Sequence, residues 1–183
     1  MPEDDPIPLT GAYWVQPGQF LAGGDPSGDE LDVTRTRLRN LIAAGIRTFV
    51  DLTEADEPAK NVQSRAPYSK VLRQVCAEES VQVTYVNFPL PDGGVPSPWT
   101  LRCILDVIDR AIADDNPVYV HCWAGRGRTG TIVGCYLKRH GLAEETNVIQ
   151  KLAALRRTTR DSAAPSPQTK EQVRLVTTWK KGA

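Results

Sequence analysis

The feature that most constrains this chain is an apolar run, PVYVHC at 117–122, that leads through a glycine-rich loop at 123–128 into an apolar helical pattern at 129–141. A strand joined to a helix through such a loop is typical of α/β proteins. Ligands in these folds bind at the carboxyl ends of the parallel strands. We therefore expect the functional site at this loop.

Strand and helix patterns alternate along the rest of the chain. We expect a hairpin at the sheet edge over 12–24, and apolar or alternating runs predict strands at 46–53, 81–90 and 117–122. Helical periodicity predicts helices at 34–45, 68–80, 99–115, 129–141, 144–157 and 166–180, the last capped by Ser166 with Pro167 in its first turn. The sequence thus predicts an α/β fold of three layers, with a central, largely parallel sheet of four to five strands flanked by helices.

Length and charge limit the organisation and the partners. We expect the 183 residues to form a loose tail at 1–8 and a single domain at 9–180. Lysine plus arginine equal aspartate plus glutamate at 22 each, so no net charge favours nucleic acid or an anionic membrane as a partner. The acidic, proline-rich N-terminus is unlike a secretory signal, and no apolar run approaches the roughly 18 residues of a membrane span. We expect a cytoplasmic monomer.

The four cysteines are widely spaced, with no C-x-x-C pair. This spacing disfavours a zinc knuckle and a disulfide framework. Cys76, Cys103 and Cys135 fall in helical patterns, and we expect them to be small buried apolar residues. Cys122 differs from them because it ends a strand and opens the glycine loop.

The sequence HCWAGRGRTG, at 121–130, has two opposed interpretations. Gly125, Gly127 and Gly130 match the G-x-G-x-x-G loop that binds a dinucleotide pyrophosphate. That fold needs a second strand that ends in an acidic residue about 20 positions later, whereas Glu144 and Glu145 open a predicted helix and no strand pattern follows. A nucleoside triphosphate loop is also disfavoured, since its Lys-Ser/Thr pair is absent. We therefore expect no nucleotide cofactor.

Covalent chemistry on a phosphate accounts for every unusual residue of the loop. A phosphoryl group needs a nucleophile in an electropositive site, and a free thiol with a pKa of about 8.5 is mostly protonated at pH 7. Arg128 supplies a planar fork for two phosphate oxygens, Thr129 is placed to donate a hydrogen bond to the thiolate, and His121 is expected to anchor the loop. The glycines let backbone amides turn inward to bind phosphate, which gives the expected phosphate ligands Trp123, Ala124, Gly125, Arg126 and Gly127.

The segment VHCWAGRGRTG resembles the signature loop of the cysteine-based protein tyrosine phosphatases, in their compact dual-specificity branch. FLAGGDP, DLTEADE, FPLPDGGVPS and SPQTKEQ resemble segments of that branch in type and order. The resemblance implies a phosphatase catalytic domain over most of the chain, with Cys122 as the nucleophile, Arg128 as a phosphate ligand, and neither a metal nor a cofactor. It also implies a general acid on a loop that precedes the nucleophile by one strand and one helix.

Asp92, in the turn PLPDGGVP, is the expected general acid. An attack that expels an alkoxide or phenoxide requires a proton on the leaving oxygen. A plain Pro-Asp-Gly turn is the other interpretation of this segment. We prefer Asp92 because the resemblance places the acid on the loop that carries it. Its competitors, all from one other loop, are Asp51, Glu54, Asp56 and Glu57.

Substrate preference is expected to depend on the variable residues of the loop, Trp123 and Arg126. In the family that the chain resembles, enzymes that dephosphorylate inositol lipids often carry a basic residue at the position of Arg126, but they also tend to have one where this chain has Trp123. An Arg126 that points to solvent is the alternative. The basic residues at 156, 157 and 160 are expected to lie in a solvated loop, and attraction of an anionic substrate is the alternative.

Two glutamines lie in SPQTKEQ, near the C-terminus. The resemblance implies that a glutamine here positions the hydrolytic water, and either Gln168 or Gln172 has a suitable place in the segment. Thr169 and Gln172 also match a helix capping box, which is a purely structural interpretation of the same residues.

The expected function is the hydrolysis of phosphomonoesters through a phosphocysteine intermediate, by a protein tyrosine or dual-specificity phosphatase. Its partner is a phosphorylated protein or a small phosphomonoester. The alternatives are a phosphoinositide or inositol phosphate phosphatase, a non-catalytic phosphate-binding module, and a sulfur-transfer domain of the rhodanese type. The presence of Cys122, Arg128 and Asp92 together disfavours the binding module, and the Arg-Thr-Gly ending of the loop disfavours sulfur transfer.

Overall fold

The computed structural model describes residues 6–54, 57 and 68–183. At its centre is a five-stranded sheet in the order β1-β2-β5-β3-β4. β1 runs antiparallel to β2, and the other three pairings are parallel. The predicted largely parallel sheet and its hairpin are confirmed. The strands are β1 (Tyr13–Gln16), β2 (Phe20–Gly23), β3 (Thr48–Asp51), β4 (Thr84–Asn87) and β5 (Val118–His121).

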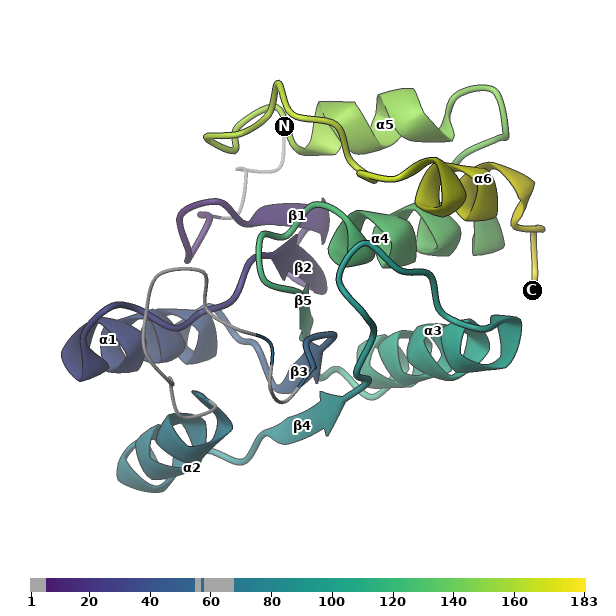
Figure 1. Cartoon of the computed structure of the whole chain (residues 1–183). Helices are drawn as coiled ribbons and strands as arrows, with labels where there is room; N and C mark the ends of the chain where they lie inside the picture. The colour runs from purple at the N-terminus through teal and green to yellow at the C-terminus, as the bar shows by residue number, and fades with distance from the viewer. Residues whose placement is uncertain (1–5, 55–56, 58–67) are drawn as a thin grey trace.

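Helices cover both faces of the sheet (Figure 1). Figure 1 shows α1 and α2 on one face and α3 and α4 on the other, with α5 and α6 lying over α4. The predicted three-layer α/β arrangement is confirmed. The helices within the described residues are α1 (Leu31–Ala43), α2 (Tyr68–Glu78), α3 (Pro98–Ala113), α4 (Arg128–Arg139), α5 (Val148–Leu155) and α6 (Lys170–Thr178).

Each face of the sheet has its own apolar core. Between the sheet and the α1–α2 layer, Leu38, Leu41, Leu72 and Val75 are buried, as their helical spacing predicts, whereas Val71 is only partly buried. The other core joins the sheet to α3, α4, α5 and α6. Burial of α4 on nearly every side explains the apolar stretch IVGCYL in its middle, and it fixes the end of the helix that carries Arg128.

The four strands that run parallel to one another also end in register. Gly23 of β2 pairs with His121 of β5, which pairs with Asp51 of β3, and Asp51 pairs with Asn87 of β4. Each of these residues is the last of its strand. The loops that follow β2, β3, β4 and β5 therefore leave the sheet at the same level, and they meet at one edge.

The start of α6 differs from the sequence expectation. The helix begins at Lys170, and its N-cap is Thr169, whose side chain accepts a hydrogen bond from the Gln172 amide. Ser166 is not the cap, because its hydroxyl donates to the Arg126 carbonyl at 2.8 Å. The prediction that Ser166 caps this helix was thus wrong, and residues 166–168 lie instead against the loop that follows β5.

The three cysteines outside the loop that follows β5 were expected to be buried, and two of them are. Cys76 and Cys135 are buried in the two cores, but Cys103 of α3 is only half-buried. All four cysteines are free. Over residues 6–54, 57 and 68–183, we find no helix with the length and apolar character needed to cross a membrane.

Candidate active site

The signature loop, residues 121–128, connects β5 to α4 at the carboxyl edge of the sheet. Cys122 directly follows β5 and is only 2% exposed. Gly125 has φ +71°, and a Cβ on it would lie 2.5 Å from the carbonyl carbon of Gly23. A side chain at this position is thus excluded by the backbone conformation and by the end of β2. The loop is curled tightly against the residue that ends the neighbouring strand.

Carbonyl groups on the outside of the loop show which way its amides point. The Trp123 carbonyl accepts from the Asp25 amide at 3.0 Å, and the Arg126 carbonyl accepts from the Gly130 amide at 3.1 Å. In a trans peptide the N–H points opposite to the carbonyl of the same peptide plane. The amides of Ala124 and Gly127 therefore face the inside of the loop, as an anion site requires.

Arg128, the first residue of α4, is held by a carboxylate and two backbone carbonyls. Its Nη1 and Nη2 donate to Glu57 Oε2 and Oε1 at 2.6 and 2.5 Å. Nη1 also lies 3.0 Å from the Leu90 carbonyl oxygen and 3.4 Å from that of Leu52. Burial lowers the pKa of this guanidinium, but the hydrogen bonds with Glu57 and the charges of Cys122, Glu57 and Asp92 outweigh it, so the pKa is raised. Arg128 is therefore charged and fixed in orientation.

Asp92 lies on a turn after β4 that reaches the signature loop. The Gly94 amide donates to the Pro91 carbonyl at 2.9 Å, and Gly93 has φ +72°, as the third position of a type II turn requires. Asp92 Oδ1 is 3.3 Å from Arg128 Nη2, and the Asp92 side chain is 68% exposed. The structure thus brings Asp92 beside Arg128 on a Pro-Asp-Gly turn, and its role as the acid stays a prediction.

His121, the residue directly before Cys122, is fully buried. Its Nε2 shares a hydrogen bond of 2.7 Å with the Tyr68 hydroxyl, and its Nδ1 lies 3.4 Å from the Cys122 carbonyl oxygen. Burial, and after it the charge of Asp51, raise the pKa of Tyr68 well above its ordinary value, so that the hydroxyl stays neutral. Asp51 itself accepts from the Tyr85 hydroxyl at 2.7 Å. This geometry fits an anchoring role for His121, which stays a prediction.

Thr129 does not serve the thiolate in this structure. Its hydroxyl donates to the Gly23 carbonyl at 3.3 Å, and a hydroxyl has one proton to donate. The expected hydrogen bond from Thr129 to Cys122 is therefore wrong. The side chain faces β2 because α4 enters the core beside that strand, and it ties the helix to the strand.

Arg126 forms an ion pair with Asp161, so the alternative that it points to solvent is not what the structure shows. Its Nε lies 3.2 Å from Asp161 Oδ2, and Arg156 Nη2 lies 3.0 Å from Asp161 Oδ1. Arg156 is 2% exposed and also donates to the Ala164 carbonyl at 3.0 Å, so its expected place in a solvated loop is wrong. Arg157 and Arg160 are exposed, as expected. Asp161 thus joins the signature loop to the segment that follows α5.

The two glutamines of the C-terminal segment take different positions. Gln172 is fully buried, with both ends of its carboxamide hydrogen-bonded, and it completes the capping box with Thr169. Gln168 is exposed, and its Oε1 would lie 2.6 Å from a Cβ placed on Gly127. Of the two, Gln168 is the one with an exposed side chain next to the signature loop.

Two contacts at the site have no local sequence pattern. The sequence predicts Glu57 only as a competing acid, whereas its carboxylate holds Arg128, and it predicts Tyr68 only as part of a helix, whereas its hydroxyl holds His121. Of the other competitors, Asp51 is buried in its own hydrogen bonds and Glu54 is exposed, while Asp56 lies outside the described residues. The resemblance of DLTEADE to a family segment was the only sequence signal for Glu57.

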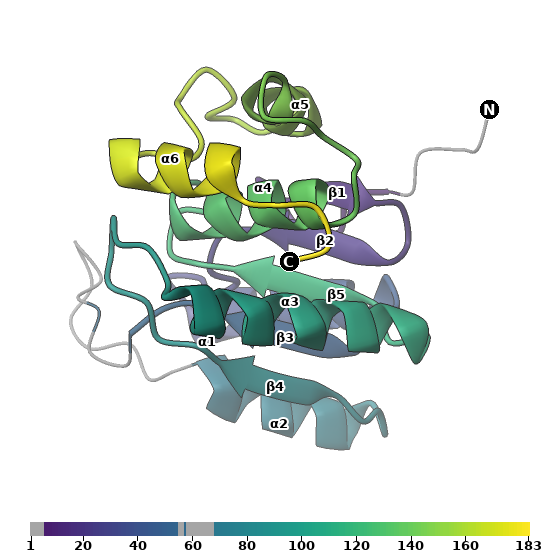
Figure 2. The same cartoon turned by 90° about the vertical axis from the view of Figure 1, so that its right-hand side faces the viewer.

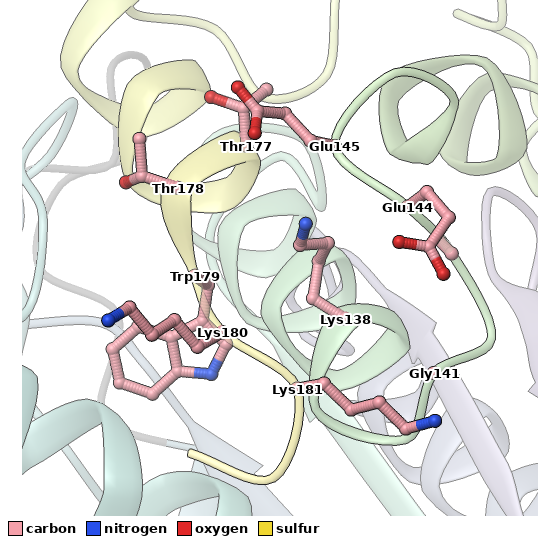
Figure 3. Close-up of a pocket in the computed structure, with 10 residues that line it drawn as sticks. Lys138, Gly141, Glu144, Glu145, Thr177, Thr178, Trp179, Lys180 and Lys181 are labelled. Carbon is pink, nitrogen blue, oxygen red and sulfur yellow. The ribbon is translucent and has the colours of Figure 1, made fainter.

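A separate cavity of about 310 Å³ lies at the other end of α4 (Figure 3). It is lined by residues from the end of α4 and from the end of α6, among them Lys138, Trp179 and Lys181, and by Glu144 and Glu145. Figure 3 shows the amines of Lys138 and Lys181 on this surface. No residue of the signature loop lines it, so the candidate chemistry belongs to the carboxyl edge of the sheet.

The arrangement at that edge combines a buried thiol, inward-facing amides, a fixed guanidinium and an exposed carboxyl group. Amides and the guanidinium suit the three non-bridging oxygens of a phosphoryl group. The thiol suits attack on the phosphorus, and the carboxyl group suits proton transfer to the leaving oxygen.

Comparisons with known proteins agree with this chemistry. A family model described as a DSP-PTPase phosphatase of polymorphic toxin systems matches residues 27–142. Protein tyrosine phosphatase domain-containing protein 1 of Mus musculus is 31% identical over 70% of this chain and 17% of its own length. The phosphatidylinositol 3,4,5-trisphosphate 3-phosphatase and protein-tyrosine-phosphatase PTEN1 of Arabidopsis thaliana is 31% identical over 63% of this chain and 28% of its own length. The chain thus spans less than a third of either relative.

Solved structures show the same fold. Tk-PTP in its active form superimposes with a TM-score of 0.63 at 23% identity, over 91% of this chain and 93% of that one. Kinase associated phosphatase gives a TM-score of 0.64 at 18% identity, over 86% of this chain and 83% of that one. The chain belongs to the DSP-PTPase phosphatases, the compact dual-specificity branch of the cysteine-based protein tyrosine phosphatase superfamily.

Proposed function

We propose that this protein hydrolyses phosphomonoesters of phosphorylated proteins through a phosphocysteine intermediate. The observation that carries the proposal is the meeting of three groups at one edge of the sheet. Cys122 lies at the base of the signature loop, Arg128 is fixed beside it, and Asp92 is 3.3 Å from Arg128. The family supports the reaction class.

In the first step the Cys122 thiolate attacks phosphorus. The S–P bond forms as the bond to the leaving oxygen breaks, and protonated Asp92 gives its proton to that oxygen. Arg128 and the loop amides hold the non-bridging oxygens throughout. In the second step ionised Asp92 takes a proton from water, the water oxygen attacks phosphorus, and Cys122 leaves as the thiolate with inorganic phosphate released.

Replacement of the nucleophile tests the proposal. We expect Cys122→Ser to lose hydrolysis of para-nitrophenyl phosphate in the presence of a chelator, with an unchanged unfolding temperature. Cys135→Ser is the matched control, since Cys135 is buried in α4 away from the loop and should keep its activity. Activity retained in Cys122→Ser contradicts the mechanism. Phosphate binding without turnover in the wild type favours the binding module, and cyanide-dependent thiosulfate turnover favours sulfur transfer.

A phosphoinositide is the second candidate substrate. A cavity of about 220 Å³ adjoins Ala124 of the signature loop, and its lining includes Arg37 and Arg160 together with Asp25 and Asp161. A second phosphate on the substrate suits such cations. One relative is named a phosphatidylinositol trisphosphate phosphatase, and PTPMT1, which superimposes with a TM-score of 0.61, was solved in complex with PI(5)P. A turnover panel of phosphotyrosine and phosphothreonine peptides, inositol phosphates and phosphoinositides separates the two candidates.

The remaining parts of the proposal concern the whole protein. We expect it to act as a monomer in the cytoplasm, with residues 9–180 as its catalytic domain and with no metal or cofactor. Full activity of the purified protein after dialysis against a chelator, together with a monomeric mass in solution, would support this.

A further inference from the structure

The start of α6 lies against both loops of the candidate site. Figure 2 shows α6 beginning beside the loop between β4 and α3, which carries Asp92. Gln172, in the first turn of α6, is fully buried there. A buried carboxamide needs hydrogen-bond partners, so the partners of Gln172 indicate what it holds.

The carboxamide of Gln172 bridges two segments. Its Oε1 accepts from the amides of Gln168 and Thr169 at 3.1 and 3.2 Å, and its Nε2 donates to the Gly94 carbonyl at 2.9 Å. The two amides can only donate and the carbonyl can only accept, so these partners allow one orientation of the group. The Oε1 end serves the helix cap, and the Nε2 end serves the acid turn.

Thr169 makes a second link to the same turn. Its hydroxyl lies 3.2 Å from the Gly93 carbonyl oxygen and accepts from the Gln172 amide at 3.2 Å. Two successive carbonyls of the turn that carries Asp92 are therefore held by side chains from the cap of α6. Asp92 is the residue directly before this pair, so its position follows that of the turn.

The same carboxamide also contacts the signature loop. A Cβ on Gly127 would lie 3.2 Å from Gln172 Oε1 and 3.3 Å from its Nε2, which is closer than an ordinary contact. Gly127 directly precedes Arg128. Gln172 thus packs on the loop that holds phosphate while it bonds to the turn that carries the acid.

We propose that Gln172 is a positioning residue that holds the acid turn, and through it Asp92, at a fixed place over the signature loop. The inference rests on the proposed phosphatase function, because it gives Gln172 a part in proton delivery. It differs from a role in orienting water, since Oε1 is already engaged by two amides. It also differs from capping alone, since Nε2 bonds outside the helix.

The substitution Gln172→Glu distinguishes the hydrogen bonds made by Oε1 from the one made by Nε2. Glutamate keeps the acceptor for the helix cap, where a negative charge is favourable, but it replaces the donor to Gly94 with an oxygen. We expect kcat/KM for phenyl phosphate to fall about tenfold, the value of one hydrogen bond. Activity on para-nitrophenyl phosphate should fall less than about threefold, because nitrophenolate leaves without full protonation. The descending alkaline limb of the pH profile should flatten, as it does when an acid is displaced.

The control variants separate a positioning role of Gln172 from a general loss of structure. Thr178→Val removes a hydroxyl that bonds only within α6 and should leave both substrates unaffected. Gln172→Met, which has similar length and no polar group, should repeat the selective loss if the glutamate variant folds poorly. Equal losses of activity on both substrates, or no loss on either, overturn the positioning role of Gln172. Cys122-dependent activity of the wild type upholds the proposed phosphatase function in that case. A wild type that is inactive on both substrates overturns both.

Discussion

Two carboxylates contact Arg128, and their exposure separates their roles. Glu57 is bidentate to the guanidinium with a side chain 12% exposed, whereas Asp92 touches one Nη with a side chain 68% exposed. A carboxylate fixed by two charge-assisted hydrogen bonds orients its partner. One that is held by a single contact and open to solvent is free to meet a leaving group. Glu57 therefore suits orientation of Arg128, and Asp92 suits proton transfer.

Asp92→Asn tests the acid directly. We expect kcat/KM for phenyl phosphate to fall about 100-fold or more, because asparagine has no proton to give at neutral pH. The loss should be smaller for para-nitrophenyl phosphate, and the alkaline limb of the pH–rate profile should disappear. Steady-state rates from pH 5 to pH 9 check this. A profile that keeps its alkaline limb would assign the acid elsewhere.

Glu57→Gln is expected to act differently. The variant keeps an acceptor but loses the charge, which weakens the hold on Arg128 by about 2 kcal/mol, or roughly 30-fold in kcat/KM. The shape of the pH profile should stay that of the wild type, because Asp92 is unchanged. Glu54→Gln, on an exposed neighbour, serves as the control. A flattened alkaline limb in Glu57→Gln would mean that Glu57, not Asp92, delivers the proton.

At the scale of elements, the end of β2 and the signature loop are packed backbone to backbone. Gly11 and Gly125 both have positive φ, +86° and +71°, but a Cβ on Gly11 meets nothing within 4 Å, whereas one on Gly125 meets Gly23 at 2.5 Å. An alanine at Gly11 therefore tests backbone strain alone, whereas an alanine at Gly125 adds a steric clash with Gly23.

We expect Gly11→Ala to cost about 1 kcal/mol through strain alone, which lowers Tm by about 2–4 °C in a domain of this size. Gly125→Ala should cost more, since the loop must also move away from β2, and it should abolish turnover. Thermal unfolding and para-nitrophenyl phosphate assays of both variants provide the check. Equal Tm values with activity retained in Gly125→Ala would show that the loop is not held by β2.

The elements were largely predictable, and their contacts were not. Apolar patterns located the helices and the strands β3, β4 and β5, because a buried face imposes its period on local sequence, and residue types around a Pro-Gly turn located the hairpin of β1 and β2. The strands are shorter than predicted, for example 48–51 against 46–53, because pairing with neighbours sets their ends. Arg128 and Glu57, which are hydrogen-bonded to each other, lie 71 positions apart in the sequence. The start of α6 likewise depends on a hydrogen bond between Ser166 and the distant Arg126 carbonyl. Such contacts depend on tertiary structure and leave no local pattern.

At the scale of the whole molecule, the tyrosines predict the response to alkali. Burial raises the pKa of all five, Tyr13, Tyr68, Tyr85, Tyr119 and Tyr136, the last to about 12. The unfolded chain loses these protons near pH 10 while the folded chain keeps them. Stability is therefore complete below about pH 10 and falls as the pH rises, by up to about 1.4 kcal/mol per pH unit for each tyrosine.

Denaturant unfolding at pH 8, pH 10 and pH 11 measures this loss. The ultraviolet signal of tyrosinate should appear together with unfolding, not before it. Tyrosines that ionise near pH 10 in a chain that is still folded would contradict the raised pKa values that follow from their burial.

The parallel strands end in register and bring Asp92, Arg128 and Cys122 to one edge of the sheet. We propose that Cys122 carries the phosphoryl group during turnover. Rapid quench of Asp92→Asn during turnover of para-nitrophenyl phosphate, followed by mass spectrometry of the peptide that contains Cys122, tests this step, because nitrophenolate leaves without the acid whereas hydrolysis of the intermediate still needs the base. We expect a phosphoryl group on Cys122 that is absent from Cys122→Ser. Release of phosphate at the wild-type rate, with no phosphoryl group on Cys122, would contradict it.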